Sequence, residues 1–246
     1  MALLDLLLVR HAESVGNQAR EAAEAEQSDR IGIDERDPDV DLTGRGREQA
    51  EALGRRLAEL PPDDFPTNVW ASPYLRAQRT ATIALATAGS QLDVQLDERL
   101  RDRELGQVDL LTRRGVHRLF PEEEQRRRHL GKMYYRPAGG ESWADVALRL
   151  RSFLGEIDGT GTPSRVLVVS HDAVVLLVRY VLERMTESEV LDLASRQSVG
   201  NASITRLVRP EASAPWTVLQ FGEDEHLTRF GAVPTEHGAE RDVHPK

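Results

Sequence analysis

Apolar and polar positions along the chain fall into blocks that are typical of strands followed by helices. Residues 3–10 are apolar at nearly every position, which is the pattern of a strand buried on both faces. Residues 165–170 repeat this pattern and form the strongest strand signal in the chain. Weaker signals predict two further strands in the first half and two closing strands, which suggest a hairpin, at residues 68–72, 91–100, 203–208 and 216–221.

Helices are expected between these strands, because apolar residues recur there at helical spacing. The expected segments lie within 12–40 and at about 41–60, 73–88, 142–157 and 173–182. We expect Ser72 to cap the third of these helices and Pro73 to occupy its first position. Alternating strands and helices predict an α/β fold, a three-layer sandwich with a mostly parallel central sheet and helices on both faces.

Two segments depart from this alternation. Residues 105–140 are charged and interrupted by glycine and proline, so we expect a helical cap insertion there. Residues 222–246 lack periodicity and are expected to form a loose tail. Since no linker divides the chain, residues 1–246 are expected to form a single domain.

Composition narrows the class of protein. The 246 residues are 39% hydrophobic and 30% charged, as in a soluble globular protein, and no apolar run approaches the ~20 residues that span a bilayer. The apolar start lacks a basic leader and continues directly into Arg10 and His11, so we expect a strand there, a cytoplasmic location and no membrane partner. The net charge of −9 argues against nucleic-acid binding, although a few arginines in one cleft can still bind an anion. The absence of cysteine excludes disulfides and thiolate chemistry.

Chemically competent residues follow the two strongest strands. Arg10 and His11 end the first, His171 follows Ser170 at the end of the other, and Arg76 lies in the first turns of a helix after a strand. In sheets of this kind, ligands bind beyond the carboxyl ends of the strands. Each of these residues alone has an ordinary structural explanation, but together they predict an anion site.

The same segments carry a resemblance to a known family. Leu-Val-Arg-His-Ala-Glu-Ser, Ser-Pro-Tyr-Leu-Arg-Ala, Gly-Gly-Glu-Ser and Val-Val-Ser-His occur in this order within roughly residues 5–208. The ordered set resembles the histidine phosphatase superfamily, phosphoglycerate mutase-like branch, of the broad-specificity phosphatase type. Asp41-Leu42-Thr43 with Gly46 and Gln49, and Asn201-Ala202-Ser203, are similar to minor landmarks of the family.

The resemblance implies a metal-independent phosphomonoester hydrolase with no cofactor, acting on a small phosphorylated metabolite. His11 would become phosphorylated, while Arg10, Arg76 and His171 surround the phosphoryl group. A neutral imidazole suits this role because its ordinary pKa lies near 6.5. The remaining histidines show no metal-ligand spacing. Further substrate contacts are expected from Ser14, Asn17, Glu104 and Tyr135.

The leaving oxygen needs a proton, which the family supplies from a carboxyl group after the third strand. Asp102 falls where the family usually has glutamate, and Glu104 competes because it lies on the same face of an extended segment. We favour Asp102, whose pKa must be raised when it faces a phosphate dianion.

Three alternatives remain open from the sequence. A phosphoglycerate mutase-type transferase would use the same core motif, and a non-catalytic phosphate-binding module or a metal-dependent hydrolase is less favoured. The basic residues of the cap form a solvated face or meet a second anionic group; they are Arg113, Arg114, Arg118, Arg126, Arg127, Arg128 and Lys132.

Overall fold

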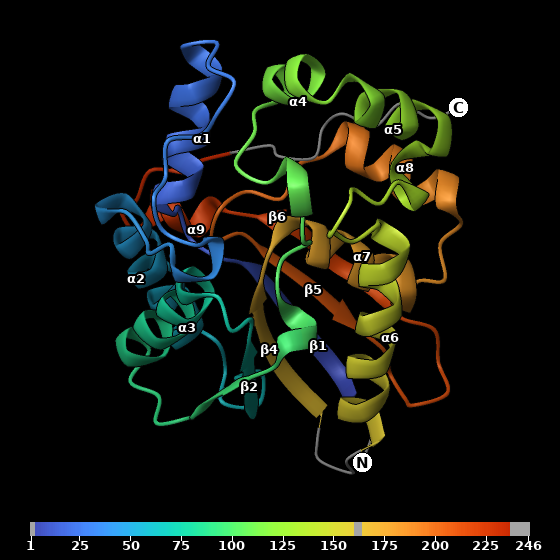
Figure 1. The fold of residues 1–246 in the computed structure, drawn as a ribbon. Coiled ribbons are helices and arrows are strands. Elements are labelled where there is room, and N and C mark those ends of the chain that lie inside the picture. Colours follow the sequence, from blue (N-terminus) through green and yellow to red (C-terminus); the bar gives the residue numbers. More distant parts are fainter. Residues whose placement is uncertain (1–2, 160–163, 237–246) are drawn as a thin grey trace.

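The computed structural model describes residues 3–159 and 164–236, which contain a six-stranded sheet of strand order β3-β2-β4-β1-β5-β6 (Figure 1). Four strands pair in parallel: β1 (Leu3–Arg10), β4 (Ser164–Ser170), β2 (Asn68–Ala71) and β3 (Val94–Leu96). The strands β5 (Ile204–Val208) and β6 (Thr217–Glu223) extend one edge as an antiparallel pair. The predicted α/β fold with a mostly parallel sheet is confirmed, although β3 is much shorter than the segment 91–100.

Helices cover both faces of the sheet. The helices α6 (Trp143–Gly159) and α7 (Asp172–Leu182) pack on one face, and α2 (Gly44–Ala58) and α3 (Leu75–Thr87) pack on the other. Alternate residues of β1 therefore enter different cores. Leu6 and Leu8 join the cluster under α6 and α7, whereas Leu7 and Val9 join the cluster under α2 and α3. This two-sided burial explains why β1 is apolar at consecutive positions.

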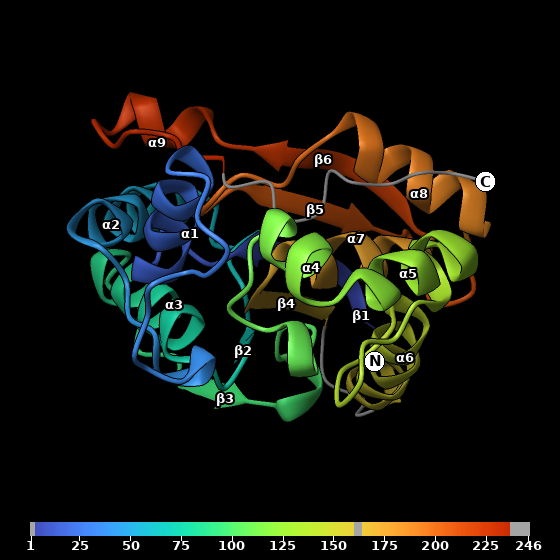
Figure 2. The same ribbon diagram turned by 45° about the horizontal axis from the view of Figure 1, so that its top comes forward.

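The remaining helices of the first two thirds of the chain gather beyond the carboxyl end of β1. Figures 1 and 2 show α1 (Val15–Ala25), α4 (Arg113–Leu119) and α5 (Pro121–Tyr134) grouped on this side of the sheet. Three short 3-10 turns complete the approach to this edge, namely η1 (Asp37–Asp39), η2 (Glu98–Leu100) and η3 (Gly106–Val108). The expected insertion at 105–140 thus consists of η3, α4 and α5.

The start of α3 differs from the prediction. The helix begins at Leu75, and its N-cap is Tyr74, which makes no side-chain capping bond. The prediction that Ser72 caps the helix from a start at Pro73 is therefore wrong. The Ser72 hydroxyl instead accepts a hydrogen bond from the Tyr74 N–H at 3.2 Å and bonds a histidine of the site.

Two helices near the end of the chain were not expected. The helix α8 (Glu187–Arg196) begins with a capping box formed by Thr186 and Glu189, a signature that is readable in the sequence. The helix α9 (Glu225–Arg229) buries Leu227 within the segment expected to be loose. The part of that expectation covering residues 237–246 lies outside the described residues. Across the described ranges, the structure contains no helix with the length and apolar character needed to cross a bilayer.

Candidate active site

Two buried histidines meet at the carboxyl ends of neighbouring strands. His11 follows β1 and His171 follows β4, and the backbone N–H of His11 donates to the Ser170 carbonyl at 2.8 Å. Their ring centroids lie 5.2 Å apart at an interplanar angle of 64°. The register of two parallel strands therefore brings together residues that are 160 positions apart in the chain.

The His11 ring has a defined tautomer. Its Nδ1 lies 2.8 Å from the Ala12 carbonyl oxygen, which can only accept, so Nδ1 carries the proton. Nε2 consequently holds a lone pair. Burial lowers the pKa of His11 well below 6.5, and the charges of Arg76, His171 and Arg10 lower it further. The imidazole is neutral at neutral pH, as a nucleophile requires.

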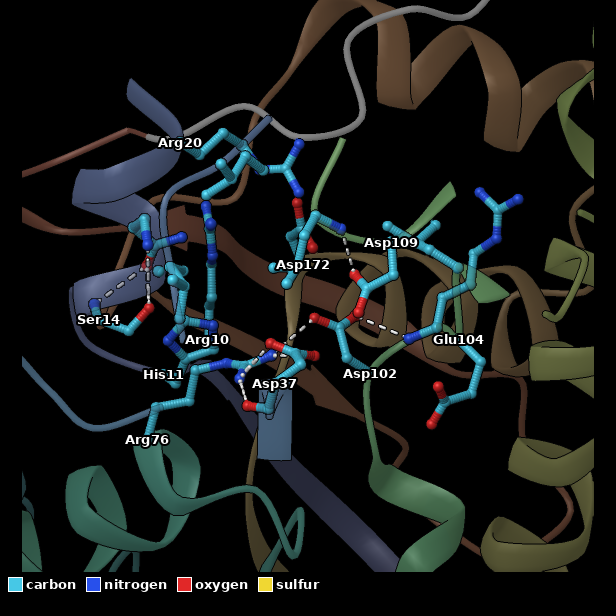
Figure 3. A pocket seen from close by; sticks show the side chains of 17 residues that line it. Arg10, His11, Ser14, Arg20, Asp37, Arg76, Asp102, Glu104, Asp109 and Asp172 are labelled. Atoms are coloured by element: carbon cyan, nitrogen blue, oxygen red, sulfur yellow. Dashed lines mark hydrogen bonds and ion pairs between the residues drawn. The ribbon is translucent and has the colours of Figure 1, made fainter. Parts of the chain in front are cut away.

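Two guanidinium groups lie beside this ring (Figure 3). Arg10 ends β1, and its side chain donates to the Val199 carbonyl at 2.6 Å. Arg76 projects from the first turn of α3, is almost completely buried, and stacks its guanidinium 4.8 Å from the centre of the Tyr74 ring. Its NH2 also lies 3.2 Å from Asp102 Oδ2.

The second histidine has a polar neighbour at each ring nitrogen. Its Nε2 is 2.9 Å from the Ser72 hydroxyl, and its Nδ1 is 3.2 Å from Asp102 Oδ2, close enough for an ion pair but without the geometry of a hydrogen bond. Burial lowers the pKa of His171, while the Asp102 carboxylate opposes that shift. The Tyr74 ring packs edge-on against the imidazole, with centroids 5.2 Å apart. These contacts fix the position of His171 relative to His11.

The two candidate acids are placed differently. Asp102 contacts both Arg76 and His171, whereas Glu104 accepts a hydrogen bond from the Tyr74 hydroxyl at 3.0 Å and is half exposed. Burial favours a raised pKa for Asp102, but His171 and Arg76 outweigh it and hold the pKa well below its usual range. Asp102 is therefore the carboxylate in direct contact with the other candidate groups, and its low pKa keeps it ionised at neutral pH.

The residues after His11 are organised by polar contacts. Ser14 caps α1, and its backbone N–H and hydroxyl both donate to Asn17 Oδ1 at 3.1 Å. Asn201 donates to the same oxygen at 3.2 Å and to the His11 carbonyl at 3.0 Å. Ser14 and Asn17 both line the pocket, and the carbonyl side of the Asn17 amide is used to shape it.

The motif residues at the start of α2 contact the segment that follows His11. Gln49 Oε1 accepts from the Glu13 N–H at 2.8 Å, and Thr43 donates to the Glu13 carboxylate at 2.6 Å. A Cβ on Gly46 would lie 2.0 Å from the Glu13 carbonyl oxygen, so only glycine permits this close approach. The minor motif positions therefore support the chain that carries His11.

The candidate pocket has a volume of about 110 Å³ and a mixed charge. Besides Arg10 and Arg76 it is lined by Arg20 and Arg103, and five carboxylates face these four arginines: Asp37, Asp102, Glu104, Asp109 and Asp172. Four of these residues, Asp37, Arg20, Arg103 and Asp109, were not predicted from the sequence as site residues. No motif marks them. Asp37 lies between α1 and α2, Arg20 lies one turn after Asn17 on α1, and Arg103 and Asp109 lie in the largely irregular segment between η2 and α4.

Tyr135 lies outside this pocket. Its hydroxyl donates to Glu123 at 2.8 Å, and its ring lines a larger cavity of about 790 Å³ beneath the cap. Arg20, Arg103 and Leu105 line both spaces, so the two adjoin. Several of the basic cap residues also line the larger cavity, namely Arg113, Arg114, Arg127 and Lys132.

Comparison with known proteins agrees with this arrangement. The sequence profile described as the histidine phosphatase superfamily (branch 1) matches residues 6–223. This chain belongs to that superfamily. The resemblance noted in the sequence is thereby confirmed.

Relatives within the superfamily carry different names. An Erwinia tasmaniensis protein named "Probable phosphoglycerate mutase GpmB" is 33% identical over 231 residues, which covers 92% of this chain and 95% of the relative. The phosphoglycerate mutase-like protein 4 of Arabidopsis thaliana is 27% identical and covers 96% and 93%.

Two solved structures of similar fold are named phosphatases. A mycobacterial glucosyl-3-phosphoglycerate phosphatase has a TM-score of 0.70 at 24% identity, covering 89% of this chain and 99% of its own. The alpha-ribazole phosphatase of Shigella flexneri has a TM-score of 0.70 at 22% identity, covering 89% and 98%. These similarities establish the histidine phosphatase fold.

Proposed function

We propose that this protein hydrolyses phosphate monoesters of small metabolites in the cytoplasm, through a phosphohistidine on His11 and without a metal ion. The observation that carries the proposal is the fixed tautomer of His11. The bond from Nδ1 to the Ala12 carbonyl leaves the Nε2 lone pair in a pocket with two guanidinium groups. Arginines beside a nucleophile stabilise the charge that spreads over the equatorial oxygens of a transferring phosphoryl group.

The reaction has two steps. In the first, Nε2 of His11 attacks phosphorus, the ester P–O bond breaks, and the leaving oxygen takes a proton from Asp102. In the second, water attacks phosphorus, the P–N bond breaks, and the Asp102 carboxylate takes a proton from the water. Inorganic phosphate and the free histidine result, so that the first-step acid acts as the second-step base.

Asp102 must be protonated before the first step. In this structure its carboxylate is stabilised by His171 and Arg76. A bound phosphoryl dianion would engage Arg76 and add negative charge beside the carboxylate, and both changes raise its pKa. We therefore expect substrate binding to be accompanied by uptake of a proton.

The charge of the pocket supports a hydrolase over a mutase. A mutase of the bisphosphoglycerate type must retain a doubly phosphorylated intermediate. Here five carboxylates face four arginines in the pocket, which disfavours such a polyanion. The mutase names of the sequence relatives make stimulation by 2,3-bisphosphoglycerate the direct check. Phosphate release without that stimulation supports the hydrolase, whereas stimulated transfer supports the mutase.

The decisive experiment traps the intermediate. The protein is mixed with a labelled phosphate monoester and quenched in alkali, which preserves phosphohistidine, or in acid, which destroys it. We expect an alkali-stable, acid-labile label that is absent from His11→Ala. Phosphate binding without label or turnover would instead indicate a binding module. Activity lost on exhaustive chelation would contradict metal independence.

A further inference from the structure

The guanidinium group of Arg76 already binds a carboxylate of this chain. Asp37, in the 3-10 turn η1, accepts from Arg76 NH1 through Oδ1 at 2.9 Å and from NH2 through Oδ2 at 3.3 Å. Figure 3 shows Arg76 beside His11, with the carboxylates of Asp37 and Asp102 both at its guanidinium end. The loop between α1 and α2 thus places a carboxylate at the position where a phosphoryl group is expected to bind.

The geometry is that of a phosphate contact. A guanidinium group binds a carboxylate or a phosphate through the same pair of parallel N–H donors. When Asp37 uses both terminal nitrogens of Arg76, those donors are not available to phosphoryl oxygens. A bound dianion beside the carboxylate would also be repelled by it. Phosphate and the Asp37 side chain therefore compete for one cation.

The Asp37 side chain can leave without releasing Arg76. NH1 also donates to the backbone carbonyl of Asp37 at 2.8 Å, and this bond does not depend on the carboxylate. The Asp37 side chain is 39% exposed, whereas that of Arg76 is 5% exposed. The carboxylate can thus rotate into solvent while its own backbone keeps the guanidinium in position.

We propose that Asp37 is an internal ligand of the phosphate site, which a phosphoryl dianion displaces on binding and which takes its place again as inorganic phosphate leaves. This inference rests on the proposed function, because it assigns phosphate to Arg76. It predicts that Asp37 weakens the binding of phosphate and hastens release of the product. If Arg76 is unoccupied for about a tenth of the time, apparent affinity falls about tenfold.

The test compares two aspartates of the same turn. Asp37→Asn keeps the shape of the side chain and one amide oxygen as a weaker acceptor, but it removes the negative charge. Asp102 still forms its ion pair with Arg76 in this variant. Asp39→Asn is the matched control, because Asp39 pairs with Arg36 at the surface and lies outside the pocket. The dissociation constant of inorganic phosphate is measured by calorimetry for both variants and the wild type, together with its inhibition constant against ester hydrolysis.

We expect Asp37→Asn to bind phosphate about tenfold more tightly than wild type and Asp39→Asn to be unchanged. Asp37→Ala, the second variant, should shift in the same direction, and thermal denaturation verifies that each variant is folded. Unchanged or weaker phosphate binding in folded Asp37→Asn would overturn the proposal and make Asp37 a positioning residue for Arg76.

The two hypotheses fail in different ways. Binding by calorimetry needs no turnover, so tighter binding by Asp37→Asn in a protein that hydrolyses nothing supports the internal ligand and overturns the hydrolase. If the wild type hydrolyses esters while Asp37→Asn and Asp39→Asn bind phosphate with equal affinity, the hydrolase is supported and the internal ligand is overturned. Absence of phosphate binding in the wild type and in both Asp37 variants, together with absence of ester hydrolysis, overturns both.

Discussion

Replacing Asp102 by asparagine should slow the hydrolysis of alkyl phosphates far more than that of p-nitrophenyl phosphate. An alkoxide leaves poorly without a proton, whereas p-nitrophenolate is stable enough to leave unprotonated. A positioned general acid contributes about 10²–10⁴ in rate. Asp102→Asn should therefore lose about 10²–10⁴ in kcat with an alkyl phosphate and much less with the nitrophenyl ester.

The fold should tolerate this change. The Asp102 side chain is 27% exposed, and Arg76 keeps its contacts with Asp37 when the carboxylate becomes an amide. The full cost of breaking a buried ion pair, about 3–5 kcal/mol, is thus not expected, and about 1–2 kcal/mol is a better figure for a partly solvated pair. Urea denaturation at pH 7 checks this separately from activity.

The matched control is Glu104→Gln, which alters the other carboxylate of the segment but not a contact with Arg76 or His171. Glu104→Gln should change kcat for the two esters equally and by little. The assay is phosphate release at saturating ester, with the first turnover followed by rapid quench so that ester cleavage is separated from hydrolysis of the phosphoenzyme. An equal loss on both esters for Asp102→Asn, or a loss confined to alkyl esters for Glu104→Gln, would refute the assignment.

Three further changes test other parts of the structure. Arg76→Lys should lower kcat/KM by about 10²–10³, because an ammonium cannot form the paired N–H contacts; steady-state kinetics would show the loss, and near-normal activity would contradict it. Burial lowers the pKa of His11 in the folded state, so just below pH 6.5 only the unfolded chain binds this proton. The free energy of unfolding should therefore fall by up to about 1.4 kcal/mol for each unit by which the pH is lowered in this range. His11→Gln should flatten that slope in urea titrations between pH 7 and 5.5, and an unaltered slope would argue against a neutral buried imidazole. Gly46→Ala should destabilise the fold by about 1–3 kcal/mol or more through its clash with the Glu13 carbonyl, whereas Gly44→Ala, with open space around it, should not; equal melting temperatures would count against the clash.

The central site was predictable because strand topology determines it. His11 and His171 follow the two most apolar runs of the chain, and parallel pairing of those strands places both at one edge. Arg76 follows a strand that pairs with β4, so its helix begins at the same edge. Their positions depend on long-range pairing that the hydrophobic pattern already specifies.

Other site residues depend on tertiary contacts that leave no periodic signal. Asp37 begins η1, a single 3-10 turn between α1 and α2, and only the folded chain shows that it reaches Arg76. The Ser72 hydroxyl was assigned to a helix cap by local rules, yet a histidine 99 positions away uses it. Tyr135 follows Gly131, whose φ of 72° interrupts the helical conformation of α5, and its hydroxyl donates to Glu123 in the first turn of that helix. Loop course and hydroxyl partners are decided by the whole molecule rather than by the adjacent sequence.

The segment after α9 has a consequence for how the enzyme matures. Thr235 bonds Asn201 through its backbone carbonyl at 3.0 Å and through its hydroxyl at 3.1 Å, and the same hydroxyl accepts from Gln49 at 2.9 Å. Asn201 in turn supports the His11 carbonyl. A growing chain on the ribosome therefore completes β6, which ends at Glu223, before the bonds of Thr235 can form, and we expect it to gain full activity only after residue 235 has left the exit tunnel.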